Sequence, residues 1–208
     1  MSTPEPAAPP LSPVVPAVFR WAGRLWLWFF GWQAVGTVPS VPKAVLIAAP
    51  HTSNWDLPFS LAVAWALGMR INFVVKASVF RFPFRGFFRW LGGIPVVRDQ
   101  RASQVERIAQ AMGREERIFL LIAPSGTRSQ VGHWKSGFMH IARAAGVPIL
   151  LCFLDFPSKR GGVGPLVTVT GNVRADMDVL RAFYAPVQGK RPENRTEIRL
   201  LEEGQGES

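Results

Sequence analysis

Two residues able to act as an acid–base pair, His51 and Asp56, stand five positions apart. Five residues of an α-helix rotate by about 140°, so the two side chains cannot share a helix face. They meet only if the chain turns between them, and residues 52–54 (Thr-Ser-Asn) favour a turn. A carboxylate bonded to one imidazole nitrogen makes the other a better base, which can deprotonate a hydroxyl that attacks a carbonyl. The alternative is a helix-capping aspartate beside an ordinary turn histidine.

The pair lies where a predicted strand passes into a predicted helix. The apolar run 44–48 is typical of a buried strand. Residues 57–67 predict a helix with Asp56 as its N-cap and Gly68 just beyond its end. In open α/β sheets, ligands and catalytic groups collect at this edge of the sheet.

The remaining chain continues to alternate strands with helices, which predicts an α/β domain. The last predicted helix begins at an N-cap provided by Asp176. We expect further strands over residues 72–75, 94–97, 118–123, 148–153 and 166–170, and helices over residues 102–112, 137–145 and 177–184.

Two arginines, like His51, lie just after the end of a predicted strand. They are Arg98 and Arg128, and Arg128 belongs to a loop of Gly, Ser and Thr over residues 124–129. Such a loop can aim backbone N–H groups and a guanidinium at a phosphate, although a plain turn is the default interpretation of the loop alone. A base and two guanidiniums on one edge describe a site for a hydroxyl substrate that carries a phosphate.

The charge distribution favours an anionic partner. The net charge is +10, and residues 57–98 and 117–154 contain no acidic residue. Phosphate-bearing small molecules, an anionic membrane surface and nucleic acid all fit this field, and an ordinary solvated basic surface is the alternative. The single cysteine, Cys152, excludes an internal disulfide and favours a reducing compartment. His133 and His140 have no companions at ligand spacing, so we expect no metal site.

The chain length of 208 residues suits one domain with terminal additions. We expect a disordered Pro-rich leader (1–17), a Trp-rich segment (18–40), the domain itself (41–188) and a polar tail with little to bury (189–208). Within residues 18–35 of the Trp-rich segment, Arg20 and Arg24 leave only residues 25–35 as an uncharged run, which is too short to span a bilayer. Its tryptophans and arginines favour a helix lying on the membrane surface. A core or dimerisation helix is the alternative.

The sequence resembles the lysophospholipid acyltransferases, a family of glycerophospholipid acyltransferases marked by His-x4-Asp. That motif is matched by residues 51–56, and the family's Gly-x-Ile-Pro-Val-Asp-Arg-like block by residues 92–98. The Phe-Pro-Glu-Gly-Thr-Arg-Ser block is matched by residues 123–129 and the Val-Pro-Ile-x-Pro block by residues 147–151. The resemblance in the order and spacing of these blocks covers about residues 44–155. The resemblance implies a glycerol-3-phosphate acyltransferase-like α/β fold, with a central mixed sheet flanked by helices and an N-terminal interfacial helix.

By this resemblance, His51 is the general base and Asp56 orients it, and the acceptor hydroxyl attacks the thioester of an acyl donor without an acyl-enzyme. Other residues are expected to hold the acceptor phosphate, with the two lysines as weaker candidates: Arg98, Arg128, Lys76 and Lys135. The expected substrate-site loop comprises Ser125, Gly126 and Thr127.

The resemblance also implies the partners of the protein. The acceptor would be a lysophospholipid, and acyl-CoA or acyl carrier protein would serve as co-substrate, with no other cofactor. We expect a peripheral or monotopic protein on the cytoplasmic face of an anionic membrane, and no nucleic acid.

Two departures from the family pattern leave the identity of the acceptor undetermined. Ser125 stands where the family has Glu, and Val97 stands where it has Asp. Lysophosphatidic acid is the default acceptor, and another lysolipid such as a lyso-aminolipid is the alternative. An esterase with Ser125 as nucleophile is disfavoured because the Gly-x-Ser-x-Gly elbow is missing. A basic membrane- or RNA-binding module with an inactive site is the remaining hypothesis.

Overall fold

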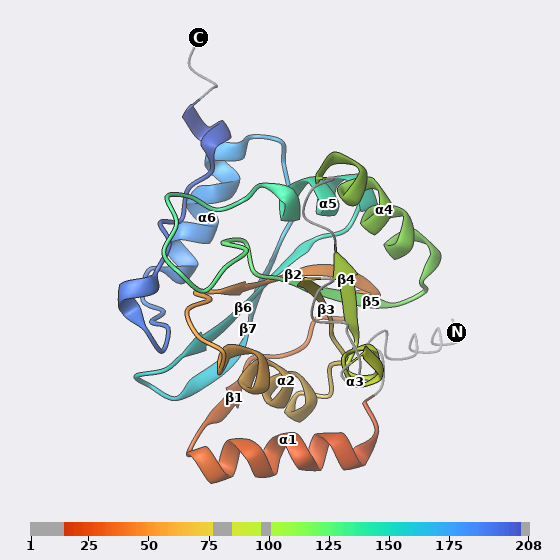
Figure 1. The fold of residues 1–208 in the computed structure, drawn as a ribbon, viewed down its shortest axis with the longest axis vertical. Coiled ribbons are helices and arrows are strands. Elements are labelled where there is room, and N and C mark those ends of the chain that lie inside the picture. Colours follow the sequence, from red (N-terminus) through yellow and green to blue (C-terminus); the bar gives the residue numbers. More distant parts are fainter. Residues whose placement is uncertain (1–14, 77–84, 97–100, 205–208) are drawn as a thin grey trace, which may run out of the picture.

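A seven-stranded mixed sheet forms the centre of the protein in a computed structural model, which describes residues 15–76, 85–96 and 101–204 (Figure 1). Its order is β1-β7-β6-β2-β5-β3-β4, and every neighbouring pair is parallel except β6 and β7. This confirms the expected central mixed sheet. The strands are β1 (Gln33–Val35), β2 (Lys43–Ala49), β3 (Asn72–Lys76), β4 (Gly93–Val96), β5 (Ile118–Ile122), β6 (Ile149–Asp155) and β7 (Arg160–Val167).

Helices cover both faces of the sheet, as Figure 1 shows. One face carries α1 (Ala17–Phe30), α2 (Asp56–Ala66) and α3 (Arg85–Trp90). The other face carries α4 (Arg101–Arg114), α5 (Gly137–Ala145) and α6 (Val173–Tyr184). Two short 3-10 turns, η2 (Pro192–Asn194) and η3 (Leu201–Gly204), follow α6.

The central strand β2 is buried on both faces, which explains its uninterrupted apolar sequence. Ala44 and Leu46 pack in the cluster under α2, whereas Val45 and Ile47 pack in the cluster under α5 and α6. All four residues are fully buried. Strand β2, from which the His51 loop departs, therefore lies between the two core clusters.

Strand β7 begins at Arg160, six residues before the strand that we predicted at 166–170, and β1 was not predicted at all. The sequence does not predict β7 because glycine is depleted in strands and this strand contains Gly161, Gly162 and Gly164. The glycine at 162 is required by the packing, since a Cβ there would lie 2.0 Å from the carbonyl oxygen of Val35 in β1.

Both predicted aspartate N-caps are wrong. The N-cap of α6 is Asn172, whose side chain accepts a hydrogen bond from the N–H of Ala175. Asp176 lies in the first turn instead, and it accepts hydrogen bonds from the N–H and hydroxyl of Thr170. Asp56 is the first residue of α2 and its N-cap is Trp55, which makes no side-chain capping bond.

The expectation that residues after 188 bury little is also wrong. Residues 186–203, here called the C-terminal strap, return across the edge of the sheet from α6. Leu200 is 3% exposed and belongs to the main core, and Thr196 is buried as well. Charged neighbours such as Glu197 and Arg199 disguise these two contacts in the sequence.

Candidate active site

The loop between β2 and α2 is built around the carboxylate of Asp56, which is 5% exposed. Its Oδ2 accepts hydrogen bonds from the backbone N–H groups of Thr52 at 2.8 Å and Ser53 at 3.0 Å. Its Oδ1 accepts the Ser53 hydroxyl at 3.1 Å. The Ser53 hydroxyl oxygen in turn accepts the N–H of Trp55. Asp56 therefore organises the turn that precedes its helix, rather than the first turn of the helix itself.

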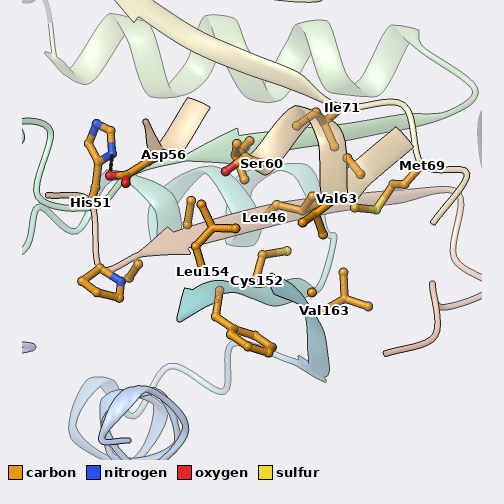
Figure 2. Close-up of a pocket in the computed structure, with 17 residues that line it drawn as sticks. Leu46, His51, Asp56, Ser60, Val63, Met69, Ile71, Cys152, Leu154 and Val163 are labelled. Carbon is orange, nitrogen blue, oxygen red and sulfur yellow. Dashed lines mark hydrogen bonds and ion pairs between the residues drawn. The ribbon is translucent and has the colours of Figure 1, made fainter. Parts of the chain in front are cut away.

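The same carboxylate holds the imidazole of His51. Nδ1 of His51 lies 2.9 Å from Oδ2 of Asp56, and the two side chains point toward one another in Figure 2. An ionised carboxylate only accepts hydrogen bonds, so Nδ1 carries the proton. The lone pair then resides on Nε2, which is the tautomer that a general base requires.

A second loop reaches the same edge of the sheet. Because β5 is the parallel neighbour of β2, residues 123–129 leave the sheet beside the His51 loop. The buried Ser125 donates its hydroxyl hydrogen bond to the carbonyl of Thr127 at 2.8 Å. The backbone of Gly126 has a φ of +66°, and a Cβ there would lie 2.9 Å from Nζ of Lys135. The Lys135 ammonium thus lies against this turn, and the Arg128 side chain is exposed.

A small cavity of about 10 Å³ lies where the two loops meet. It is bordered by His51 and Ser125 and, from α6 and the strap, by Tyr184, Arg195 and Thr196. The Tyr184 hydroxyl lies within hydrogen-bonding distance of the carbonyl oxygens of Ile47 and Cys152, and burial raises its pKa well above the ordinary value. Sequence analysis missed these contributors, because no motif marks them.

A larger and mainly apolar cavity of about 40 Å³ begins at the His51–Asp56 pair, here called the dyad. In Figure 2, His51 and Asp56 lie at one end of the lining, and Met69, Ile71 and Val163 lie at the other. Its walls come from β2, α2, β6 and β7. Cys152 faces this space, and burial raises the pKa of its thiol above the ordinary value.

The other two residues predicted to bind phosphate lie wholly or partly outside the described structure. Arg98 lies outside the described residues. Lys76 ends β3 at the same edge of the sheet, but its side chain is outside the described part of the structure. Within the described residues, no group of three or more His, Cys, Asp or Glu side chains could hold a metal ion.

Helix α1 has one face in the core and one face open to solvent. Gly23 and Leu27 are buried against α2, and a Cβ at Gly23 would lie 2.6 Å from the carbonyl oxygen of Ala62. In the described part of the chain, no helix is long and apolar enough to cross a membrane. The opposite side of α1, together with α3, forms an exposed surface here called the aromatic face: Val18, Trp21, Leu25, Trp28, Phe29, Phe87 and Trp90.

Comparison with known proteins matches the chain to one family. The family model described as Acyltransferase matches residues 35–154. The chain is 29% identical over 142 residues to a 1-acyl-sn-glycerol-3-phosphate acyltransferase of Haemophilus influenzae, covering 64% of this chain and 58% of the relative. It is 32% identical over 118 residues to the protein of that name from Salmonella typhimurium, covering 53% and 47%. The chain therefore spans about half the length of these relatives.

A solved structure shares the fold. The crystal structure of the 1-acyl-sn-glycerophosphate (LPA) acyltransferase, PlsC, from Thermotoga maritima superposes with a TM-score of 0.58. The match covers 81% of this chain and 78% of that chain, at 15% identity. At this identity the similarity supports the arrangement of sheet and helices alone.

Proposed function

The chain belongs to the Acyltransferase family, and from that premise we propose that it transfers a fatty acyl group to the free hydroxyl of a lysophospholipid. The observation that carries the proposal is the 2.9 Å contact between His51 Nδ1 and Asp56 Oδ2 at the mouth of an apolar cavity. This arrangement supplies a base of defined tautomer beside a space suited to hydrocarbon.

In the proposed reaction, Nε2 of His51 takes the proton of the acceptor hydroxyl while its oxygen attacks the thioester carbonyl. The C–O bond forms, the C–S bond of the tetrahedral species breaks, and the thiolate leaves with the proton returned from His51. Asp56 stabilises the imidazolium that exists between these two transfers. The acyl group passes directly from donor to acceptor.

We place the acyl chain of the donor in the larger cavity. Its apolar lining removes hydrocarbon from water at about 0.8 kcal/mol per CH₂. With a volume of about 40 Å³, the cavity must widen through rotation of its side chains before it holds more than a few carbons. Side chains at its far end, Met69, Ile71 and Val163, then determine which chain lengths fit.

Lysophosphatidic acid is the acceptor that we propose, in agreement with the names of the two relatives. The exposed Arg128 and the Lys135 ammonium at the Gly126 turn stand on the loop beside His51, where they would bind the acceptor phosphate. Arg98 and Lys76, which follow or end neighbouring strands, are further candidates. Ser125 is too short to make the contacts of a glutamate, so a lyso-aminolipid remains the competing acceptor.

We further propose that the aromatic face rests on the cytoplasmic surface of the membrane that contains the acceptor. The rings of Phe19 and Trp90 lie 5.5 Å apart and join α1 to α3, so the face is continuous across both helices. Tryptophan is favoured at the membrane–water boundary. The exposed Trp55, in the loop of the dyad, lies 6.0 Å from Phe30 at the end of α1 and links the face to the site.

The proposal is tested with purified protein and labelled acyl-CoA or acyl carrier protein, presented with a panel of lysolipids in mixed micelles. Mass spectrometry should detect a diacyl product from lysophosphatidic acid that requires His51. Turnover unchanged in His51→Ala would refute the mechanism. Product from a lyso-aminolipid alone would replace the proposed acceptor.

A further inference from the structure

The C-terminal strap contacts the loop between His51 and Asp56 at Thr52. Thr52 is buried, with only 1% of its surface exposed. The Oγ1 of Thr52 accepts the backbone N–H of Arg191 at 3.2 Å, and its carbonyl accepts Nδ2 of Asn194 at 3.4 Å. The N–H of the same residue donates to Asp56. Thr52 therefore joins the strap to the carboxylate that orients His51.

Steric contact strengthens this joint. Gly189 is buried in the strap, and a Cβ there would lie 2.5 Å from Oγ1 of Thr52 and 3.2 Å from the ring of Pro50. A side chain at 189 must displace the backbone or side chain of Thr52. The absence of a side chain at this position thus sets how closely the strap and loop approach.

Both ends of the strap are fixed to other parts of the active-site edge. Near its start, Gln188 forms two hydrogen bonds at the end of β6. Its N–H donates to Oδ1 of Asp155, and its carbonyl accepts the N–H of Phe156. Farther along, the carbonyl of Arg199 accepts the N–H of Trp134, and Thr196 Oγ1 accepts the N–H of Val131. Residues 131–134 continue the loop that carries Ser125 and Arg128. One segment therefore holds both loops of the site in relation to each other.

We infer that the C-terminal strap is a positioning element of the acyltransferase site, in which Gly189 and Thr52 set the placement of the His51–Asp56 pair. The inference rests on the proposed function for its kinetic consequence, but the placement itself can be observed without turnover. A displacement of Thr52 moves the N–H that fixes Asp56, and with it the imidazole. Misplacement of a catalytic group by about 1 Å can cost on the order of a hundredfold in rate.

Two pairs of variants separate positioning from a general loss of stability. Gly189→Ala places a methyl group against Thr52, whereas Gly113→Ala places one in open space on α4 and serves as its control. Thr52→Val keeps the shape of the side chain and removes the acceptor of the Arg191 N–H, whereas Thr52→Ser keeps that acceptor. Each variant is assayed for kcat, for KM of donor and acceptor, and for melting temperature.

We expect Gly189→Ala to lower kcat by roughly tenfold to a hundredfold, with both KM values within about twofold of the unmodified protein. Thr52→Val should lose several-fold more kcat than Thr52→Ser, and Gly113→Ala should retain full activity. Unchanged kcat in Gly189→Ala, or a loss that merely follows the unfolded fraction at the assay temperature, would overturn the inference.

Imidazole NMR provides the measurement that does not depend on turnover. The chain has three histidines, so the ring nitrogens of His51 can be assigned by comparison with His51→Ala. The unmodified protein should show His51 protonated on Nδ1, and Gly189→Ala should shift or broaden that signal while Gly113→Ala does not. An unperturbed His51 signal in Gly189→Ala would refute the positioning role. An altered signal in a protein that acylates no lysolipid would instead refute the proposed function.

Discussion

Asp56 receives the His51 imidazole on the same oxygen, Oδ2, that accepts two backbone N–H groups of the intervening loop. The carboxylate is therefore fixed by the loop before it fixes the imidazole. One buried group maintains the local backbone and orients the imidazole. The two partners of the dyad consequently differ in their importance for stability.

We predict that His51→Ala greatly slows catalysis without unfolding the protein, whereas Asp56→Ala lowers both catalysis and folding stability. General-base catalysis contributes about 10²- to 10⁴-fold, which is the loss expected for His51→Ala. Asp56→Ala leaves buried N–H donors unsatisfied, and each costs about 1–3 kcal/mol. Guanidinium unfolding curves and acyl-transfer assays of both variants provide the test. Equal destabilisation by the two substitutions would contradict this division of roles.

The position of the dyad could be predicted from sequence because it depends on local signals. An apolar run, a turn of Thr, Ser and Asn, and an apolar helix leave little choice for where residues 50–56 lie. The bonds from Asp56 to the backbone could not be predicted, because an aspartate before a helix more often signals an N-cap. The strap was missed because its hydrogen bonds to Thr52 join residues 139 and 142 positions apart, and each uses a backbone atom of one partner, which no motif marks.

For the second loop, we predict that Arg128→Ala raises KM for lysophosphatidic acid about tenfold or more. A hydrogen bond to a charged group contributes roughly 1.5–3 kcal/mol. The same substitution should change KM for monoacylglycerol, which lacks the phosphate, by less than about twofold. Arg143→Ala is the matched control, since this exposed arginine lies in the last turn of α5, away from the loop. Equal effects on both acceptors would exclude phosphate binding by Arg128.

For the larger cavity, we predict that substitutions of Val163 change the preferred length of the acyl chain. Val163→Ile adds a methylene to the far end and should favour shorter donors, and Val163→Ala should favour longer ones. One methylene contributes about 0.8 kcal/mol, or roughly fourfold in relative kcat/KM. Val167 is the control, because it lies on the same strand but packs in the core cluster of the opposite face. The same shift after substitution of Val167 would exclude a role for the cavity.

For the aromatic face, we predict that replacing Trp21, Trp28 and Phe29 together by alanine weakens liposome binding at least tenfold. Burial of a large apolar side chain contributes on the order of 1.5–3 kcal/mol, so three losses far exceed the tenfold threshold of 1.4 kcal/mol. Deletion of α1 would be a poor test, because Gly23 and Leu27 of this helix are buried and Leu27 belongs to the core. Val179→Ala is the control, because it changes an exposed hydrophobic residue of α6, on the other side of the sheet. Co-sedimentation equal to that of this control would refute the membrane-facing role.

For Cys152, we predict a thiol that is inert in the folded protein. Burial raises its pKa above the ordinary value, so the reactive thiolate is scarce even at pH 9. Ellman's reagent at pH 8 should modify the folded protein at least a hundredfold more slowly than the protein in guanidinium.

The raised pKa of Cys152 also makes folding stability depend on pH. The unfolded chain releases the thiol proton near its ordinary pKa and the folded chain does not. The contribution of Cys152 to folding stability is therefore complete below that pKa and declines as the pH rises above it. Urea unfolding of the protein and of Cys152→Ala between pH 7 and pH 10 measures the difference, which should shrink with rising pH; a constant difference would refute the raised pKa.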